Sequence, residues 1–126
     1  MLLEERLKGE ITSNLLAYLI LVCINKHQGV SYGYQMKLFI EDLLQKSVLE
    51  GTLYSLLSKL ADKKKYGYLE SFQEETERKR IRRFYRLTEK GRQQLEKWPK
   101  KWNELKVFVD NTLLEVGMVQ EISVKN

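Results

Sequence analysis

Residues 78–88 are RKRIRRFYRLT, a stretch with a basic first half and an aromatic second half. Five of the six positions from Arg78 to Arg83 are lysine or arginine. The bulky, alternating side chains from Ile81 to Leu87 are typical of a half-buried β-strand. A dense charge run is often only a solvated loop, but this one runs into a strand that can hold it in place. The stretch therefore predicts a strand that carries a basic loop.

A second strand is expected just before the basic run. Tyr68 to Phe72 (YLESF) is also short, aromatic and alternating, and the polar segment from Gln73 to Arg80 is typical of a hairpin loop. Side chains alternate between the two faces of a strand. One face is therefore predicted to hold Ile81, Arg83 and Tyr85, and the other Arg82, Phe84 and Arg86. Not every arginine can face the same partner, and we expect Arg86 to be structural.

Three helical patterns precede the hairpin. The segment from Glu10 to Lys26 is almost uniformly apolar from Leu15 onward, which predicts a helix that is buried on most sides. Apolar residues recur every three or four positions from Tyr32 to Gln45, and again from Glu50 to about Lys63. Two short helices with a tight connection form the outline of a helix-turn-helix. The expected fold class is therefore mainly α with a small β-hairpin wing (α+β), a winged helix-turn-helix.

The last part of the chain predicts one long helix. Thr88 is a suitable N-cap, and Glu89 suits the positive end of the helix dipole. Apolar residues then recur at alternating three- and four-residue steps, with one polar member. This heptad seam consists of Leu95, Trp98, Trp102, Leu105, Val109, Thr112 and Val116. Pro99 removes a backbone donor, so we expect a kink near Leu95 to Trp98.

The heptad seam has two explanations. The helix could cover its own domain, or it could pair with a second copy of the chain, and the length of the seam and its two tryptophans favour pairing. The expected dimer contacts are Leu95, Trp98, Trp102, Leu105, Val109, Leu113 and Val116. We therefore expect a winged helix-turn-helix in residues 1–87, a dimerisation helix packed with the first helix in residues 88–118, and a flexible tail in residues 119–126.

The composition is that of an ordinary globular domain. The 126 residues are 43% hydrophobic and 31% charged, which favours one domain with a modest core. The longest apolar run, Leu15 to Ile24, has about half the length needed to span a bilayer. The acidic N-terminus lacks the cleavage site of a secretion signal. We therefore expect a cytoplasmic protein with no membrane partner.

The basic charge is concentrated in one segment. Residues 63–92 contain eleven lysines and arginines and five acidic residues, a net charge of +6, whereas the rest of the chain has a net charge of −1. Such asymmetry is typical of a face that binds a polyanion. Basic membrane helices interleave bulky apolar residues at helical spacing, and this segment does not. The charge pattern thus favours nucleic acid over a membrane surface.

The sequence offers no catalytic or metal site. The only cysteine, Cys23, lies in the most apolar stretch, where a buried inert thiol is the simplest interpretation. The only histidine, His27, is expected at a solvated helix end. One cysteine and one histidine are too few for a zinc site, and no Ser-His or Cys-His pair suggests nucleophilic catalysis. We expect no enzymatic activity and no bound cofactor or metal.

Three motifs occur in order along the chain. They are YGY at residues 32–34, opening the second helix, GTLY at residues 51–54 in the third helix, and FYRLTEKGR at residues 84–92, leaving the hairpin. Together they resemble the PadR family of winged-helix transcriptional regulators, particularly its shorter subfamily with a single C-terminal helix. The resemblance covers about residues 9–110.

The chain departs from the family pattern at three places. Ser55 stands where proline is usual, and Pro99 is unusual at its position. The connection from Ala61 to Tyr68 (ADKKKYGY) is about three residues longer than is usual in the family. Its three lysines, residues 63–65, either extend the third helix or form a separate phosphate contact. These departures affect the groove and the dimer rather than the fold.

The resemblance implies that the third helix enters the major groove of DNA and that the hairpin contacts phosphates. The DNA-binding residues that it implies are Tyr34, Thr52, Tyr54, Ser55, Ser58, Lys59, Lys63, Arg78, Lys79, Arg80, Arg82 and Arg83. Two alternatives stay open at this point. Tyr54 could be a core aromatic residue, and the charges of the hairpin could simply be solvated.

The resemblance also implies a homodimeric repressor that binds a palindromic operator in double-stranded DNA and is released by a small molecule. In drug-sensing relatives a tryptophan at the place of Trp102 stacks planar aromatic ligands, so Trp102 is a candidate effector contact unless it is plain dimer core. Two other classes of function stay open. A nonspecific DNA- or RNA-binding module would not prefer a palindromic duplex, and a protein-interaction adaptor would not bind DNA.

Overall fold

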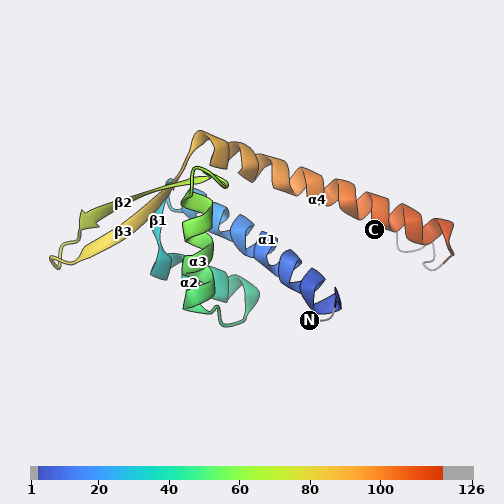
Figure 1. Ribbon diagram of the computed structural model, residues 1–126, viewed down its shortest axis with the longest axis horizontal. Coiled ribbons are helices and arrows are strands. Elements are labelled where there is room, and N and C mark those ends of the chain that lie inside the picture. Colours follow the sequence, from blue (N-terminus) through green and yellow to red (C-terminus); the bar gives the residue numbers. More distant parts are fainter. Residues whose placement is uncertain (1–2, 118–126) are drawn as a thin grey trace. The chain divides into compact units, whose positions relative to one another are not determined.

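The computed structural model describes the backbone of residues 3–117 and the side chains of residues 13–117 (Figure 1). Elements follow one another in this part of the chain in the order α1-β1-α2-α3-β2-β3-α4. The chain divides into two compact units, the first ending at Leu95 and the second beginning at Glu96. The tail expected for residues 119–126 lies outside the described residues. None of the described helices is long and apolar enough to cross a membrane.

Helix α1, Leu3–Lys26, supplies much of the core. It begins seven residues before the predicted start at Glu10. From residue 16 onward most of its side chains are buried, and the buried set is Leu16, Ala17, Leu19, Ile20, Leu21, Cys23 and Ile24. The helix contacts α2, α3, β1 and β3. The prediction of a helix buried on most sides is therefore confirmed for this part of α1.

Helices α2, Gly33–Leu44, and α3, Glu50–Ala61, form the expected helix-turn-helix. Each buries one apolar stripe against the core: Met36 and Ile40 from α2, and Leu53, Leu57 and Leu60 from α3. The third helix ends at Ala61, before the predicted end near Lys63. Asp62 has φ −72° and ψ 113°, an extended backbone, and this stops the helix.

The sheet contains three antiparallel strands in the order β1-β3-β2. Their bounds are Val30–Tyr32 for β1, Leu69–Glu75 for β2 and Ile81–Leu87 for β3. The hairpin was predicted, but β2 runs three residues past Phe72, so the loop is shorter than expected. Strand β1 was missed. It pairs with the inner half of β3, where Ser31 lies opposite Tyr85, and thus makes β3 the central strand.

The start of helix α4, Glu89–Glu115, is bonded to the connection between α3 and β2. The Gly91 N–H donates to Thr88 Oγ1 at 3.1 Å, which confirms Thr88 as the N-cap. The Thr88 hydroxyl in turn donates to the Gly67 carbonyl at 2.6 Å, and the Thr88 N–H to the Tyr68 carbonyl at 3.0 Å. Gly91 packs so closely on the Tyr68 carbonyl that a Cβ there would collide with it. This junction holds the start of α4 against the connection that follows α3.

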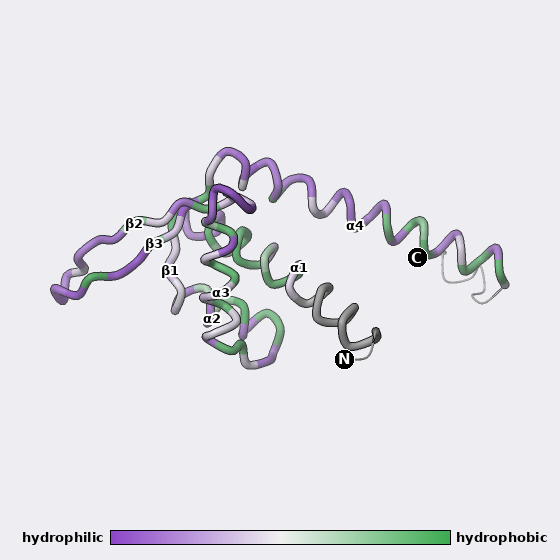
Figure 2. The backbone as a smooth tube through the Cα atoms, in the orientation of Figure 1, coloured by the Kyte–Doolittle hydropathy of each residue, from purple (hydrophilic) through white to green (hydrophobic). Residues whose placement is uncertain are grey.

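The second unit contains the remainder of α4. The helix runs without interruption through Pro99. The kink expected near Leu95 to Trp98 stays a prediction. The rings of Trp98 and Trp102 lie parallel, with centroids 6.2 Å apart and planes 8° apart. Farther along, apolar residues alternate with polar ones (Figure 2), and many are exposed: Leu105, Val107, Phe108, Val109 and Val116. The observed elements confirm the predicted fold class, a winged helix-turn-helix with a long C-terminal helix.

Candidate nucleic-acid interface

A groove of about 980 Å³ lies between helix α3 and the sheet. The start of α2 closes one end of it, and the side chains that define it include Tyr34, Tyr54, Ser58, Ser71, Arg83 and Tyr85. We call this hollow the α3–sheet groove. Tyrosine rings and hydroxyl groups dominate its walls, and its charged residues are Arg82 and Arg83 of β3 and Asp62, with a net positive charge. It is therefore suited to a polar, negatively charged occupant.

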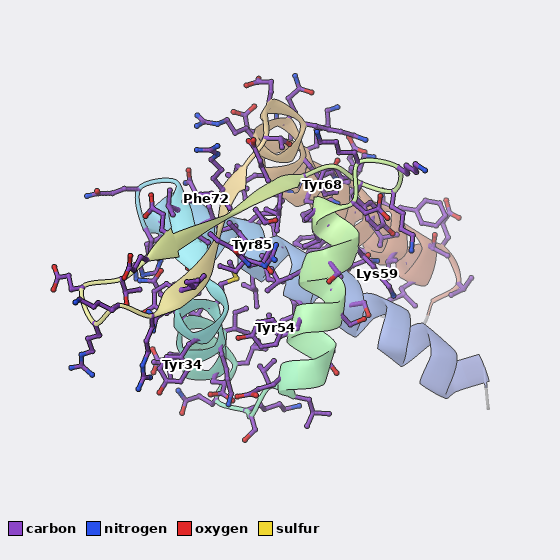
Figure 3. All side chains as sticks on the ribbon, turned by 60° about the vertical axis from the view of Figure 1, so that its left-hand side comes forward. Tyr34, Tyr54, Lys59, Tyr68, Phe72 and Tyr85 are labelled. Atoms are coloured by element: carbon purple, nitrogen blue, oxygen red, sulfur yellow. The ribbon has the colours of Figure 1, made fainter. Side chains whose placement is uncertain are left out.

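Tyr54 is positioned by a glycine of α2. A Cβ built on Gly33 would lie 2.5 Å from Tyr54 Oη and 2.6 Å from a ring carbon, so the ring rests on the bare backbone of Gly33. Tyr54 is nevertheless 47% exposed. Figure 3 shows it on the side of α3 that faces Tyr85 and Tyr34, whereas Lys59 projects from the other side. Tyr54 is thus a surface residue and not a core residue, and the contact of its ring with Gly33 fixes its orientation.

Tyr85 and Arg83 lie on the face of β3 that lines the groove. Tyr85 is 6% exposed, and burial raises the pKa of its hydroxyl, with Tyr54 adding to the rise and Arg83 opposing it. The Arg83 guanidinium donates a hydrogen bond from Nη1 to Ser71 Oγ on β2 at 3.1 Å. This bond fixes the direction of the Arg83 side chain while its charge stays exposed. Ser71 is therefore a positioning residue for Arg83.

The opposite face of the hairpin is covered by aromatic rings and arginines. The Arg82 guanidinium lies 4.1 Å from the ring centroid of Tyr32. The ring of Phe84 contacts Tyr32 and Phe72 on the neighbouring strands, with centroids 5.7 Å apart in both cases. Arg86 lies over Phe72 and donates to the Glu70 carboxylate at 3.2 Å. Arg86 thus has the structural contacts that were expected of it.

The basic tip of the hairpin is a loop closed by backbone hydrogen bonds, and its charged side chains are exposed. The Thr76 N–H donates to the Arg80 carbonyl at 2.8 Å, and the Lys79 N–H to the Thr76 carbonyl at 2.9 Å. Lys79 has φ +57°, in the left-handed region that favours glycine or asparagine. Arg78, Lys79 and Arg80 are all exposed. The loop therefore presents three positive charges on a defined backbone rather than on a disordered run.

The sequence-predicted DNA-binding residues fall into separate places on the first unit. Those that line the α3–sheet groove are Tyr34, Tyr54, Ser58, Arg82 and Arg83. Thr52, Ser55 and Lys59 lie on the remaining exposed surface of α3, and Lys63 lies in the turn after it. Arg78, Lys79 and Arg80 form the hairpin tip. The sequence-based prediction of the site missed Gly33, Ser71 and Tyr85. Of these, only Tyr85 could have been inferred, because the alternation of β3 places it on the same face as Arg83.

Cys23 and His27 form no second site. Cys23 is buried, and burial raises the pKa of its thiol, although a hydrogen bond with Ser31 and the charge of Lys26 oppose the rise. The buried thiol agrees with the inert cysteine that was expected. His27 is half-buried rather than solvated, because Nδ1–H donates to the Cys23 carbonyl at 2.7 Å and the ring packs edge-on against Phe39. Within the described residues, no group of three potential ligands could hold a metal.

Comparison with known proteins gives the same family from a family model and from solved structures. The model of the transcriptional regulator PadR-like family matches residues 20–97. Among solved structures, smu.1704 of Streptococcus mutans is 35% identical, with a TM-score of 0.63, over 86% of this chain and 93% of its own. A PadR-like transcription factor of Bacteroides fragilis is 26% identical, with a TM-score of 0.68, over 85% and 98% of the two chains.

A third match was crystallised on DNA. Bacillus subtilis PadR, in complex with operator DNA, is 31% identical with a TM-score of 0.56, over 67% of this chain and 46% of its own. The chain thus spans just under half of that protein. No curated protein matches this sequence.

The contact between Gly33 and Tyr54 can be tested by a double-mutant cycle. Gly33→Ala should lower the free energy of unfolding by about 1–3 kcal/mol, because the new Cβ meets the tyrosine ring. In a Tyr54→Ala background the same substitution should cost less than about 0.5 kcal/mol, because the ring is gone. Urea denaturation followed by circular dichroism measures all four variants.

Gly51→Ala is the matched control for this cycle. It makes the same chemical change within the first turn of α3, where nothing lies within 4 Å of the added Cβ. It should be neutral or should stabilise by up to about 1 kcal/mol. An equal cost of Gly33→Ala in both backgrounds would contradict the packing of Tyr54 on Gly33.

Proposed function

Because the chain belongs to the PadR-like family of transcriptional regulators, we propose that it is a homodimeric repressor that binds a palindromic operator in double-stranded DNA. The observation that carries the proposal is the α3–sheet groove, where a solvent-exposed recognition helix and an arginine-bearing wing face each other. Bacillus subtilis PadR, which shares this fold, was crystallised on operator DNA. As a regulator of chromosomal DNA, the protein would act in the cytoplasm and without enzymatic activity.

Helix α3 is the proposed reading element. Its twelve residues make it about 18 Å long, and the major groove of B-DNA, about 12 Å wide, admits such a helix. The side chains that would meet base edges are Thr52, Tyr54, Ser55, Ser58 and Lys59, which are all exposed. Hydroxyl groups pair with several bases, so they discriminate weakly. Specificity would then depend partly on DNA shape and on the palindrome.

The wing is the proposed source of affinity. Arg78, Lys79 and Arg80 would contact phosphates from the hairpin tip, and Arg83 would do so from the groove, where Ser71 holds it. Tyr34, which is 56% exposed at the start of α2, would contact the backbone beside the groove. Arg82 leaves β3 on the opposite face, and its stacking on Tyr32 would bring it to the rim of the groove. These contacts carry little sequence information but would fix the register of α3.

The exposed apolar side chains of α4 support pairing with a second copy. Leu105 is 59% exposed, Val109 43% and Val116 60%, more than a monomeric helix usually leaves in water at successive turns. We propose that residues 88–118 form a dimerisation helix that packs with the first helix, through the expected dimer contacts Leu95, Trp98, Trp102, Leu105, Val109, Leu113 and Val116. A two-fold dimer would present two α3 helices about one DNA turn apart, which matches a palindromic site.

Selection of bound fragments from a random duplex library tests the DNA proposal. We expect a single palindrome, because two identical helices are related by a two-fold axis. For six or so phosphate contacts, the affinity for that duplex should fall by roughly 10³-fold between about 50 and 200 mM salt. Enrichment without a palindrome would favour a nonspecific nucleic-acid-binding module. An absence of salt-dependent binding would favour a protein-interaction adaptor.

Trp102 is the proposed contact of a small-molecule effector. Its ring lies parallel to that of Trp98, so the two residues offer a flat apolar surface on α4. A planar aromatic cation that stacks there should quench tryptophan fluorescence and release the operator. Because the chain has two tryptophans, Trp98→Phe leaves only Trp102 as a reporter and should retain the quenching, whereas Trp102→Phe should lose it. Equal quenching in both variants would rule out a site at Trp102.

A further inference from the structure

A turn with three consecutive lysines follows the recognition helix, and none of the three lysines lines the α3–sheet groove. Helix α3 ends at Ala61, so the lysines at residues 63–65 do not extend it. They occupy a hydrogen-bonded turn before β2, and all three are exposed. We call residues 62–68 the lysine turn. The hairpin tip and the lysine turn are both strongly hydrophilic, and they form two separate segments of the first unit (Figure 2).

The backbone of the lysine turn is held by Asp62. The Asp62 carbonyl accepts N–H bonds from Lys65, Tyr66 and Gly67 at 3.0, 3.1 and 3.0 Å. The Asp62 carboxylate accepts the N–H of Lys64 at 2.9 Å. Gly67 has φ +62°, a conformation that favours glycine, and its carbonyl accepts the Thr88 hydroxyl. The turn is therefore preorganised, and binding through it would cost little backbone entropy.

The turn has an excess of positive charge, because it contains three lysines and one carboxylate, Asp62, which accepts a backbone N–H. Among the described residues, the ion pairs are Lys37 with Glu50 and Arg86 with Glu70, and neither involves the lysine turn. Lys90, in the first turn of α4, adds a further ammonium group 5.6 Å from the ring centroid of Tyr68. Tyr66 is 44% exposed among these charges and packs on Tyr68. The surface thus combines several available ammonium groups with an aromatic ring.

We propose that the lysine turn is a second phosphate-binding surface, separate from the hairpin tip, that contacts the DNA backbone beside the C-terminal end of α3. This inference rests on the proposed binding of duplex DNA. A helix of about 18 Å spans a major groove of about 12 Å, so both of its ends approach phosphates when it lies across the groove. The C-terminal end of a helix carries a partial negative charge and would repel a phosphate. Lysines placed directly after that end reverse the sign of the local potential.

The position of the lysine turn, directly after α3, favours DNA phosphate over other anionic partners. The lysine turn begins at the residue that follows α3, and Lys59, in the last turn of α3, is exposed as well. A membrane-binding surface would require bulky apolar residues between the charges, and Lys63, Lys64 and Lys65 have none. An acidic protein surface is the remaining alternative, and the experiment below separates it from DNA.

The test removes the three charges of the turn by Lys63→Gln, Lys64→Gln and Lys65→Gln together. Binding to the operator duplex selected above, about 30 base pairs long, is followed by fluorescence anisotropy between about 50 and 200 mM salt. Each lost phosphate contact should lower the slope of log affinity against log salt by about 0.9, so we expect a decrease of about 2–3. The thermal unfolding midpoint should not change, because all three side chains are exposed.

Two matched variants remove the same number of positive charges elsewhere. The first carries Arg78→Gln, Lys79→Gln and Arg80→Gln at the hairpin tip, and it should lower the slope by a similar amount. The second carries Lys97→Gln, Lys100→Gln and Lys101→Gln on α4, and it should leave the slope unchanged. A scan of single neutral methylphosphonates along the operator then locates the contacts. A methylphosphonate should no longer weaken binding at the phosphates that a variant has ceased to contact. We expect these phosphates to differ between the lysine-turn variant and the hairpin-tip variant.

Two outcomes would overturn the inference. The lysine-turn variant could keep the wild-type slope, as the α4 variant should, and the turn would then be free for another partner, such as an acidic protein. It could instead lose the same phosphate contacts as the hairpin-tip variant, and the turn would then not be a separate surface. A wild-type protein that binds no duplex would instead overturn the proposed function, so the two failures can be told apart.

Discussion

Strand β3 is hydrogen-bonded along both edges, to β1 on one side and to β2 on the other, and the rest of the first unit depends on this pairing. An isolated two-stranded hairpin is marginally stable in water. The short strand β1 adds a third member and brings the inner half of β3 against α1. Tyr85 and Leu87 can then be buried while the outer half of the same strand extends into solvent. The basic tip is consequently carried by a strand that is anchored in the core.

This arrangement explains why positive charge can be concentrated in one segment without destabilising the domain. The apolar residues of α1, α2 and α3 form a core that contains almost no charge. The arginines of β3 leave the strand on opposite faces: Arg83 bonds Ser71 in the groove, Arg86 lies over Phe72, and Arg82 stacks on Tyr32 at the rim of the groove. Their mutual repulsion is reduced because they point to opposite sides and have individual partners. The recognition helix and the wing are thus held together by packing rather than by charge.

The sequence predicted those features that depend on local pattern. The apolar stripes of α2 and α3, the alternation of β3 and the cap at Thr88 were all visible as short-range regularities, and the structure confirms them. Strand β1 was missed because three residues are too few for a periodic signal, and the strand exists only through pairing with residues more than fifty positions away. The end of α3 at Ala61 was missed because Lys63–Lys65 are good helix formers, whereas the hydrogen bonds to Asp62 favour a turn.

The same distinction applies to the candidate site. The residue types at the hairpin tip and on α3 indicated nucleic acid without a structure. The sequence did not indicate the contacts that orient these residues, because those contacts join different elements. Ser71 of β2 bonds Arg83 of β3, and Gly33 of α2 packs on Tyr54 of α3. The DNA-binding roles of the individual residues stay predictions, and the geometry of the groove supports those of Tyr54, Ser58 and Arg83.

We propose that two copies of this chain bind one palindromic duplex. Native mass spectrometry of the protein with the selected operator measures the stoichiometry directly. We expect two chains per full palindrome, and we expect a duplex that contains one half-site to bind far more weakly, since a single recognition helix makes too small an interface for tight binding. One chain per duplex, with equal affinity for full and half sites, would contradict binding by a two-fold dimer.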